Sequence, residues 1–296
     1  MPIVHQTIDT LPHSVSFPKR ESEKAVLMAK PDYYDVLYEI NPHMQGNIGT
    51  VNKTIAMEQW KILKGIYEDL GLRVHILPGV PNLPDMVFAA NQTFPFIDLN
   101  GKRRVILSKM ASEHRQPEVA HFAQWYAEHG FDVIDHTDPP VEFEGMGDAI
   151  WHPGRRLLYI GYGFRTKLGA LQRAANCIRC DVIGLELINS HFYHLDTALS
   201  VIDDKTALYV PDAFTSTGHA ILQEMFEYLI EVPLLEAKTG FVTNGHSPNG
   251  THFIVHKGNF ITVSKLQEIG IEVIEIDTSQ FLKSGGSVFC MKMMLP

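Results

Sequence analysis

A repeated pattern of helix, glycine and strand most constrains the fold of this chain. Three segments read alike, YEDLGLRVHIL, YAEHGFDVIDH and LQEIGIEVIEI, and in each the end of an amphipathic helix precedes a glycine and a short strand. The glycines are Gly71, Gly130 and Gly270, where a left-handed C-cap is expected. Two looser copies, NCIRCDVIGLEL and EYLIEVPLLE, join a helix to a strand without the glycine.

Hairpin-like sequences alternate with these helix-to-strand joints. The stretches FPFIDLNGKRRVILS, AIWHPGRRLLYIG, LSVIDDKTALYV and HFIVHKGNFITVS each contain two β-rich runs around Asn-Gly, Pro-Gly, Asp-Asp or Lys-Gly. Together the patterns predict about five ββαβ units with a period of roughly 40 to 60 residues, in one closed, pseudosymmetric α/β domain. A two-domain, doubly wound protein is the alternative, but it requires parallel strands without these hairpins, and no G-x-G-x-x-G motif follows a strand.

The composition is that of an ordinary globular protein and limits its partners. Of the 296 residues, 45% are hydrophobic and 20% are charged, and the formal net charge is -9. This acidic balance argues against nucleic acid as a partner and is compatible with a cationic small-molecule substrate. No apolar run is long enough to span a membrane, and residues 1–24, an N-terminal extension with little periodicity, lack the order of a secretory signal. We therefore expect a cytoplasmic protein, and homo-oligomerisation stays open.

The cysteines and histidines do not form a convincing metal or disulfide pattern. Three cysteines are an odd number, which fits a reducing compartment. Cys177 and Cys180 form a C-x-x-C pair, but no second pair accompanies it, and chance spacing at a helix end is the favoured interpretation. His191 and His194 also lack further ligands of suitable spacing. The sequence therefore predicts no metal.

The third cysteine, Cys290, stands in a different context. It follows two glycines flanked by serines in LKSGGSVFC, close to the last hydrophobic residues of the chain. Glycines let the backbone adopt unusual dihedrals and approach a ligand closely, so this loop is suited to exposing a reactive thiol. The alternative is a turn that feeds a last buried strand, with Cys290 as a small buried hydrophobic residue.

Two motifs with carboxylates suit a cationic ligand. Glu144 and Asp148 flank two glycines in VEFEGMGDAIW, and one carboxylate accepts two parallel hydrogen bonds from a planar guanidinium. In HFYHLDTALS, His194 precedes Asp196 by two residues, so in an extended segment both side chains point the same way and the carboxylate orients the imidazole. A solvated turn and a satisfied strand histidine are the respective alternatives.

Two arginines and two asparagines complete the candidates. Arg115 lies before a helix in SEHRQPE and Arg165 follows a Gly-rich strand end in GYGFRT, where a guanidinium fork would clamp a substrate carboxylate. Asn41 in YEINPHMQGN and Asn91 in PDMVFAANQ are able both to donate and to accept hydrogen bonds. Surface salt bridges and turn asparagines are the commoner explanations for each residue taken alone.

The ordered set of motifs resembles a known superfamily. INPHMQGN, PDMVFAAN, FEGMGD, GYGFRT, FYHLDT and LKSGGSVFC occur in this order through most of the chain and are similar to motifs of the guanidino-group-modifying enzymes, the penteins. Members of that superfamily have a five-bladed ββαβ propeller. Within it, the chain is most similar to the arginine dihydrolases, and next to dimethylargininases and arginine deiminases. The resemblance begins after the N-terminal extension and implies a single pentein domain over residues 25–296.

The resemblance implies roles by position. Cys290 would be the nucleophile and His194 the general acid and base. Asp196 would stand beside His194, and Glu144 would hold the substrate guanidinium. Deiminases and dimethylargininases usually show E-G-G-D where this chain has EGMGD, so Asp148, a substrate-binding residue by the same resemblance, stands one residue further along. The dihydrolase-like branch shares this departure.

The same resemblance implies that Arg115 and Arg165 bind the amino-acid carboxylate. Asn91 stands where the deiminase branch carries aspartate. Because asparagine donates as well as accepts, it would hold both a guanidinium and the neutral ureido product and so permit a second hydrolysis. Asn41 would help to position the reacting group.

The implied activity is cysteine-dependent hydrolysis of arginine to ornithine, carbon dioxide and two ammonia through a covalent thiouronium-type intermediate, with no cofactor. Hydrolysis of dimethylarginine, or deimination of arginine to citrulline, is the nearest alternative. Two alternatives belong to other classes: an amidinotransferase, which passes the amidino group to an amine, and a non-enzymatic pentein that binds the ribosome.

Overall fold

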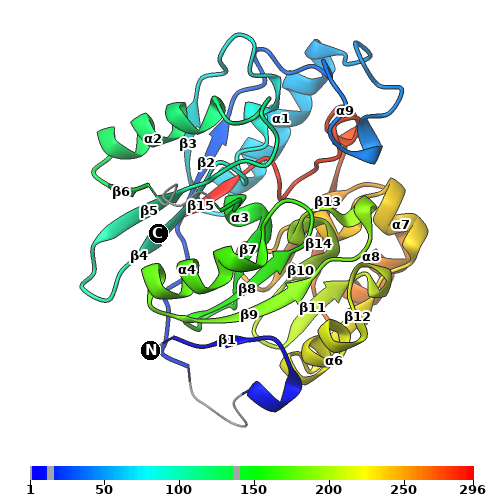
Figure 1. Ribbon diagram of the computed structural model, residues 1–296. Helices are drawn as coiled ribbons and strands as arrows, with labels where there is room; N and C mark the ends of the chain where they lie inside the picture. The colour runs from blue at the N-terminus through cyan, green and yellow to red at the C-terminus, as the bar shows by residue number, and fades with distance from the viewer. Residues whose placement is uncertain (1, 12–16, 136–140) are drawn as a thin grey trace.

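The fold is an assembly of five small β-sheets, each with its own helix (Figure 1). The computed structural model describes residues 2–11, 17–135 and 141–296, and within these residues fifteen strands form the five sheets. Each sheet contains two parallel neighbouring strands joined by a helix. These strand–helix–strand units are β2 (Ala25–Ala29), α1 (Lys53–Asp69) and β3 (Arg73–Leu77); β5 (Arg103–Leu107), α2 (Glu118–Glu128) and β6 (Asp132–Ile134); β8 (Leu157–Tyr162), α4 (Leu168–Ile178) and β9 (Asp181–Glu186); β11 (Thr206–Tyr209), α6 (Ser216–Met225) and β12 (Tyr228–Glu231); and β13 (His252–His256), α8 (Phe260–Glu268) and β14 (Glu272–Ile276).

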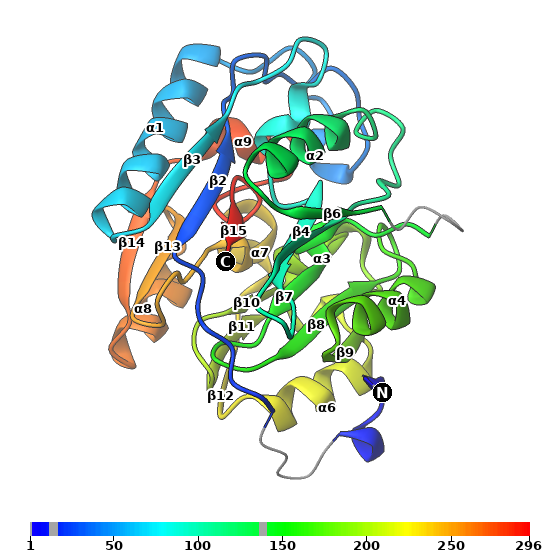
Figure 2. The same cartoon turned by 90° about the vertical axis from the view of Figure 1, so that its left-hand side faces the viewer.

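Four sheets carry a further strand that pairs antiparallel with the first strand of the unit. These strands are β4 (Thr93–Ile97) on β5, β7 (Ala149–Trp151) on β8, β10 (Leu199–Val201) on β11 and β15 (Met293–Leu295) on β2. In the fifth sheet, an isolated bridge between His246 and Ile254 takes this position. Because β15 comes from the C-terminus and β2 from near the N-terminus, the two ends of the domain share one sheet (Figure 2).

The helix ends follow the sequence prediction. Gly71, Gly130 and Gly270 come after α1, α2 and α8 and have φ angles of 83°, 76° and 87°, the left-handed region that glycine enters without steric cost. Each of these helices packs one face on the core. On α1 this face consists of residues at helical spacing, namely Ala56, Trp60, Leu63 and Tyr67.

Three of the four predicted hairpins are confirmed and one is wrong. β4–β5, β7–β8 and β10–β11 pair as expected, but NFITVS, predicted as a strand after β13, is the start of α8. Glu236 of α7 (Leu234–Thr239) accepts hydrogen bonds from the backbone N–H groups of Ile261 and Thr262 at 2.7 and 3.0 Å. This contact caps the first turn of α8 and outweighs the β propensity of its β-branched residues.

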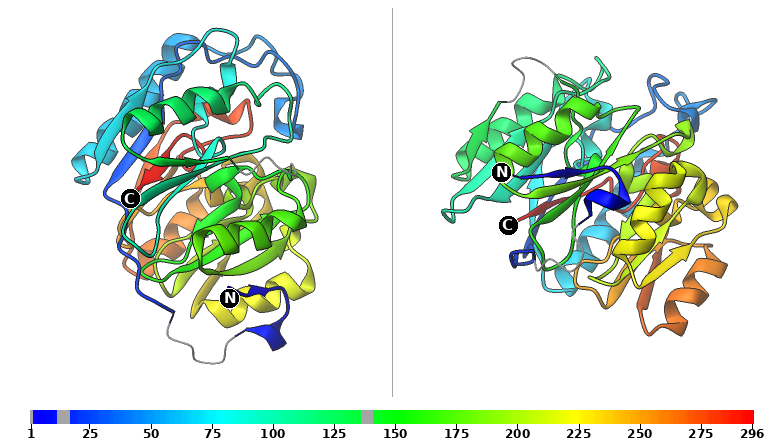
Figure 3. Two further views of the ribbon diagram at one scale, coloured as in Figure 1. Left: turned by 60° about the vertical axis from the view of Figure 1, so that its left-hand side comes forward. Right: turned by 60° about the horizontal axis from the view of Figure 1, so that its bottom comes forward.

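The described part of the N-terminal extension lies against the sheet of β7, β8 and β9. β1 (Val4–His5) pairs parallel with β9 (Figure 3). Further along, Arg20 N donates to Gly154 O at 3.0 Å, and Arg156 N donates to Pro18 O at 2.8 Å. The extension is therefore fastened to the turn between β7 and β8.

Short helical turns precede the inner strands and set up the candidate site. They are η3 (Pro84–Val87) before β4, α3 (Gly145–Asp148) before β7, α5 (Leu195–Ala198) before β10, η6 (Val242–Asn244) before β13 and α9 (Ser279–Leu282) before β15. Figures 1 and 2 show α1, α2 and α6 on the outside of the molecule and α3 and β15 near its middle. Over the described part of the chain, no helix combines the length and apolar character needed to cross a membrane.

Candidate active site

Five turns from different sheets meet near the middle of the molecule. Each turn is hydrogen-bonded to the next, and the last returns to the first, so their side chains are held around a common cavity. The bonds run from Ala90 N to Cys290 O (3.1 Å), Met146 N to Ala90 O (2.8 Å), Leu195 N to Asp148 Oδ1 (3.0 Å), Asn244 Nδ2 to Asp196 O (3.0 Å) and Phe289 N to Asn244 O (2.8 Å).

This catalytic cavity contains most of the residues that the sequence predicted. Six of them line it: Asn41, Asn91, Arg115, Arg165, His194 and Cys290. The other three, Glu144, Asp148 and Asp196, stand behind the lining and hydrogen-bond to His194, to Leu195 N and to Cys290 respectively. The structure thus gathers all nine predicted residues at one place.

The thiol of Cys290 lies between a carboxylate and an amide. Its Sγ donates to Asp196 Oδ2 at 3.1 Å and accepts from Asn244 Nδ2 at 3.2 Å, and the side chain is only 3% exposed. Burial raises the pKa of the Cys290 thiol well above its ordinary value, and the Asp196 carboxylate raises it further. A cation bound beside the sulfur would favour the thiolate, which is the nucleophilic form.

The imidazole of His194 contacts a different carboxylate. Nε2 lies 2.7 Å from Glu144 Oε2, and Nδ1 lies 3.5 Å from Asn91 Nδ2. Burial acts to raise the pKa of Glu144, but the hydrogen bond with His194 and the charge of Arg165 outweigh it and lower the pKa to about 2. Glu144 is therefore ionised at neutral pH and orients the imidazole.

The extended segment predicted for His194 and Asp196 is wrong. Residues 195–198 form the helical turn α5, and Asp196 contacts Cys290, while Glu144 is the carboxylate on His194. Burial raises the pKa of Asp196 to about 7. Its Oδ1 has no hydrogen-bond partner among the residues that the structure describes.

Asp148 supports the site from behind. Its Oδ1 accepts from Leu195 N at 3.0 Å, and its Oδ2 accepts from Thr166 Oγ1 at 2.7 Å. Thr166 Oγ1 in turn accepts from Glu144 N at 3.0 Å. Burial raises the pKa of Asp148 to about 7. Asp148 therefore joins the turns that carry Glu144 and His194.

Arg165 presents a partly free guanidinium to the cavity. Nη2 donates to Ile40 O at 2.9 Å, Nη1 lies 3.6 Å from Glu144 Oε2, and the guanidinium stands 5.0 Å from the centre of the Tyr193 ring. Tyr193 OH donates to Gly285 O at 2.7 Å, which fixes the ring. This arrangement leaves donors of Arg165 for an anionic group in the cavity.

Arg115 is bound much more completely by the protein. It forms an ion pair with Glu118 at 3.0 Å, and Nη1 donates to Asn91 Oδ1 at 3.0 Å. Nη2 also donates to the backbone oxygens of Asp85 and Phe88, at 3.1 and 3.2 Å. Most donors of Arg115 are therefore occupied, and one of its functions is to orient the amide of Asn91.

Three residues of the site were not predicted from the sequence. Asp85 lines the cavity with a buried, unpartnered Oδ1, while its Oδ2 accepts from Tyr38 OH at 2.8 Å. Asn244 donates to the sulfur and accepts from Cys290 N at 3.3 Å, so it fixes both the backbone and the thiol of Cys290. Tyr193 packs on Arg165. The motif PDMVFAAN contains Asp85 and is the signal that could have revealed it; FVTNGHSP gives none for Asn244.

The EGMGD turn needs glycine at its fourth position, Gly147. A Cβ at Gly147 would overlap Asn91 Nδ2, so Gly147→Ala is expected to lower the free energy of unfolding by about 1–3 kcal/mol through overpacking and to displace Asn91. Urea denaturation measures this change. Gly65→Ala in α1 is the control, because nothing lies within 4 Å of its Cβ and alanine favours the helix. Equal stability of Gly147→Ala and wild type would contradict the packing argument.

The described residues contain no group of three or more His, Cys, Asp or Glu side chains that could hold a metal ion. The chemistry that these residues offer by themselves is a buried thiol, an imidazole fixed by a carboxylate, and amide, carboxylate and guanidinium groups facing one cavity. Such a set suits nucleophilic attack with general acid–base catalysis on a cationic substrate.

Comparisons with known proteins identify the family. The family model for "N,N dimethylarginine dimethylhydrolase, eukaryotic" matches residues 39–295. The bifunctional arginine dihydrolase/ornithine cyclodeaminase of Synechocystis sp. is 34% identical over 90% of the chain, which spans 37% of that relative's length. The dimethylarginine dimethylaminohydrolase of Mycobacterium tuberculosis is 35% identical over 89% of the chain and 83% of its own length.

Solved structures agree with these relatives. The N-terminal domain of the cyanobacterial arginine dihydrolase ArgZ, in a cysteine-to-serine mutant bound to its substrate, superposes with a TM-score of 0.86 at 33% identity, covering 92% of this chain and 97% of that domain. The same domain bound to its product gives the same TM-score of 0.86. The chain therefore belongs to the N,N dimethylarginine dimethylhydrolase family.

Proposed function

We propose that the chain hydrolyses the guanidino group of arginine to ornithine, carbon dioxide and two ammonia. The observation that carries this proposal is the contact of Cys290 with Asp196 and of His194 with Glu144 around one cavity. The similarity to a substrate-bound arginine dihydrolase domain supports arginine as the substrate. The position of Asn91, whose Nδ2 lies 3.5 Å from His194 Nδ1, supports hydrolysis in two stages.

Binding of arginine would use the free acceptors and donors of the cavity. The substrate carboxylate would pair with Arg165, whose guanidinium faces the cavity beside Tyr193. Asp85 Oδ1, buried and unpartnered, would accept from a cationic N–H group of the substrate. Asn41 Nδ2 donates to Ser284 O at 2.9 Å and its Oδ1 accepts from His43 N at 3.0 Å, so the amide is fixed at the cavity wall, where it would help to position the reacting group. The guanidinium cation beside Cys290 would favour the thiolate.

The first stage would release one ammonia. The Cys290 thiolate attacks the guanidino carbon, and a carbon–sulfur bond forms. His194, oriented by Glu144, protonates the leaving nitrogen, and the carbon–nitrogen bond breaks to leave a thiouronium on sulfur. His194 then takes a proton from water, which attacks the same carbon and displaces the sulfur, so that citrulline is the product of this stage.

The second stage would repeat these steps on the ureido group. Thiolate attack and loss of the second ammonia give a thiocarbamate on Cys290, and water releases a carbamic acid that decomposes to ornithine and carbon dioxide. Two waters are consumed in total. Asn91 is suited to both stages because its Nδ2 is a donor for the ureido oxygen, and its Oδ1, which accepts from Arg115, has a second lone pair for the guanidinium.

Hydrolysis of dimethylarginine is the second candidate, because the family model and the M. tuberculosis relative carry that name. Incubation of the purified chain with L-arginine and, separately, with dimethylarginine, followed by amino-acid and ammonia analysis, distinguishes the two. We expect ornithine and two ammonia per arginine. Citrulline and dimethylamine from dimethylarginine, with arginine untouched, would favour the second candidate. Neither substrate being consumed would contradict both.

Asn91→Asp is expected to convert the reaction largely to one stage. An aspartate accepts from the guanidinium but repels the ureido oxygen, so citrulline should accumulate and the ornithine to citrulline ratio should fall at least about 10-fold, a change of about 1.4 kcal/mol. Amino-acid analysis of a time course measures the ratio. Unchanged ornithine formation in a folded variant would contradict the role of Asn91.

Arg165→Ala is expected to weaken arginine binding by about 2–5 kcal/mol, the effect of truncating one partner of a buried charge pair. Agmatine, which lacks the carboxylate, should be a poor substrate of the wild type. The ratio of kcat/KM for the two substrates in wild type and variant is the measurement. Equal wild-type activity on arginine and agmatine would remove the basis for this assignment.

We further propose that the five sheets form a five-bladed pentein propeller over residues 25–296, with residues 1–24 as an extension. Support comes from the five strand–helix–strand units and from the ring of hydrogen bonds that joins their turns. The pairing of β15 with β2 would close the propeller.

A further inference from the structure

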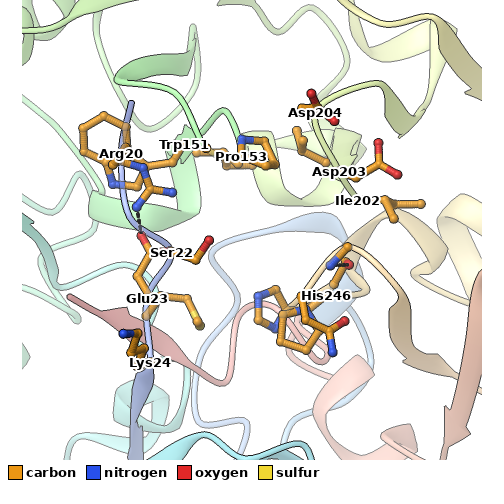
Figure 4. Close-up of a pocket in the computed structure, with 18 of the residues that line it drawn as sticks. Arg20, Ser22, Glu23, Lys24, Trp151, Pro153, Ile202, Asp203, Asp204 and His246 are labelled. Carbon is orange, nitrogen blue, oxygen red and sulfur yellow. Dashed lines mark hydrogen bonds and ion pairs between the residues drawn. The ribbon is translucent and has the colours of Figure 1, made fainter. Parts of the chain in front are cut away.

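A second cavity, of about 1100 Å³, lies behind the catalytic cavity. This rear cavity is bounded by the N-terminal extension, the β7–β8 and β10–β11 turns and the loop before β13. Figure 4 shows Arg20 beside Trp151 on one side of the cavity, with Asp203 and His246 away from them. Phe289 and Lys292 line the rear cavity, while Cys290 lines the catalytic one. The nucleophile segment is therefore the partition between the two cavities.

The lining of the rear cavity is basic, in contrast to the chain as a whole. Five basic residues and three acidic ones contribute, for a formal balance of five minus three, or +2, whereas the net charge of the chain is -9. The basic residues are Lys19, Arg20, Lys24, Arg155 and Lys292, and the acidic ones are Glu23, Asp203 and Asp204. An anion is the ligand that this balance favours.

Two of the acidic side chains are already engaged. Glu23 forms an ion pair with Arg20 at 2.6 Å. Asp203 Oδ1 accepts from the backbone N–H groups of Lys205 and Thr206, at 2.8 and 2.7 Å, and so closes its own turn. Outside the Arg20–Glu23 pair, four basic residues face two acidic ones, so the lining keeps a formal balance of four minus two, or +2.

The floor of the rear cavity holds the buried amine of Lys292, which has no close carboxylate among the described residues. Lys292 is fully buried, its Nζ lies 3.2 Å from the centre of the Phe289 ring and 3.8 Å from Met146 Sδ. In the part of the chain that the structure describes, no carboxylate lies within 4.0 Å of this Nζ. Burial lowers the pKa of Lys292 to about 7, because a buried charge without a close counter-charge is costly and a thioether and a ring face compensate it only in part.

Lys292 also acts electrostatically on the catalytic residues. Burial raises the pKa of Asp196, and the charge of Lys292 counters that rise. Asp196 in turn accepts from the Cys290 thiol at 3.1 Å. A change in the surroundings of the Lys292 ammonium is therefore transmitted to the nucleophile through one carboxylate.

We propose that the rear cavity binds a small anion carrying a carboxylate or a phosphate, which supplies the counter-charge for Lys292. Lys24 and Arg155 line the same cavity from the extension and the β7–β8 turn, and they provide further donors. The site is distinct from the catalytic cavity, because the two share no lining residue. The proposal of an anion site does not depend on which guanidino compound the enzyme hydrolyses.

The test uses sodium malonate and sodium phosphate as probes, with sodium chloride at equal ionic strength as the reference. A ligand of the folded state raises the unfolding temperature in a saturable way. We expect malonate or phosphate to raise the unfolding temperature in the wild type and not in Lys292→Met, whose unbranched side chain is one heavy atom shorter and carries no charge. A response to malonate alone identifies a carboxylate ligand, and a response to phosphate alone a phosphate ligand.

Two further variants make the result decisive. Arg165→Ala removes one of the two arginines that line the catalytic cavity and leaves the rear cavity unchanged, so the temperature shift should persist in this variant. Lys24→Ala should weaken anion binding several-fold, as measured by isothermal titration calorimetry, and stays folded because it changes only the wall of the rear cavity. No saturable shift in the wild type, an equal shift in Lys292→Met, or loss of the shift in Arg165→Ala would each overturn the proposal. The Lys24→Ala result applies even if Lys292→Met does not fold, and unchanged affinity there would also count against it.

Discussion

Replacing Cys290 by serine is expected to lower kcat for arginine by about 10³-fold or more, because an unactivated hydroxyl is a far poorer nucleophile than a thiolate. The fold should be preserved, since serine fits the same space and keeps hydrogen-bonding capacity toward Asp196 and Asn244. Steady-state kinetics and the urea unfolding midpoint measure the two quantities. Arginine binding, measured by calorimetry, should survive in the inactive variant.

Cys177→Ser is the matched control for this experiment. Cys177 lies near the end of α4, does not line the catalytic cavity and is partly exposed. Its replacement should leave kcat within a few-fold of wild type. Wild-type turnover by a folded Cys290→Ser variant would rule out covalent catalysis by this residue.

Replacing His194 by alanine is expected to lower kcat by about 10²–10⁴-fold, the usual contribution of a general acid and base. The imidazole lines the catalytic cavity and is held by Glu144 at 2.7 Å, so its loss removes the group that would protonate the leaving ammonia and activate water. Both stages of the reaction should slow. The pH dependence of kcat, which reports ionisation in the substrate complex, should change shape as well.

His191→Ala is the control for the His194 variant. His191 is a neighbouring histidine on η4 (Ser190–Phe192) that does not line the catalytic cavity. Its replacement should change kcat only slightly. A His194→Ala variant with nearly full activity would require a different proton donor and would contradict the assignment.

The sequence was informative where chemistry is concentrated in a short motif. Cys290 after two glycines, His194 in FYHLDT and Arg165 in GYGFRT were each recognisable locally, and all three line the catalytic cavity. The distances between these three side chains could not be predicted from the sequence, because they depend on hydrogen bonds between turns from different sheets, such as Ala90 N to Cys290 O. The spacing of residues along the chain does not reveal this ring of hydrogen bonds between turns.

The errors have local physical causes. Four residues of helix in α5 are too short to show a helical period, so the segment after His194 read as a strand and Asp196 was paired with the wrong residue. The start of α8 read as a strand because β-branched residues dominate it, while the cap from Glu236 lies far away in sequence. Asn244 was missed because a buried asparagine that holds a loop has no sequence signature.

The central claim is that Cys290 forms a covalent intermediate with the guanidino carbon of arginine. Its most direct test is rapid acid quenching of the wild type during turnover of arginine, followed by intact-protein mass and peptide mapping. We predict a transient species heavier by the mass of arginine less one ammonia, with the modification on the peptide that contains Cys290. Formation of citrulline or ornithine with no adduct at any quench time, or an adduct on Cys177 or Cys180 instead, would contradict the claim.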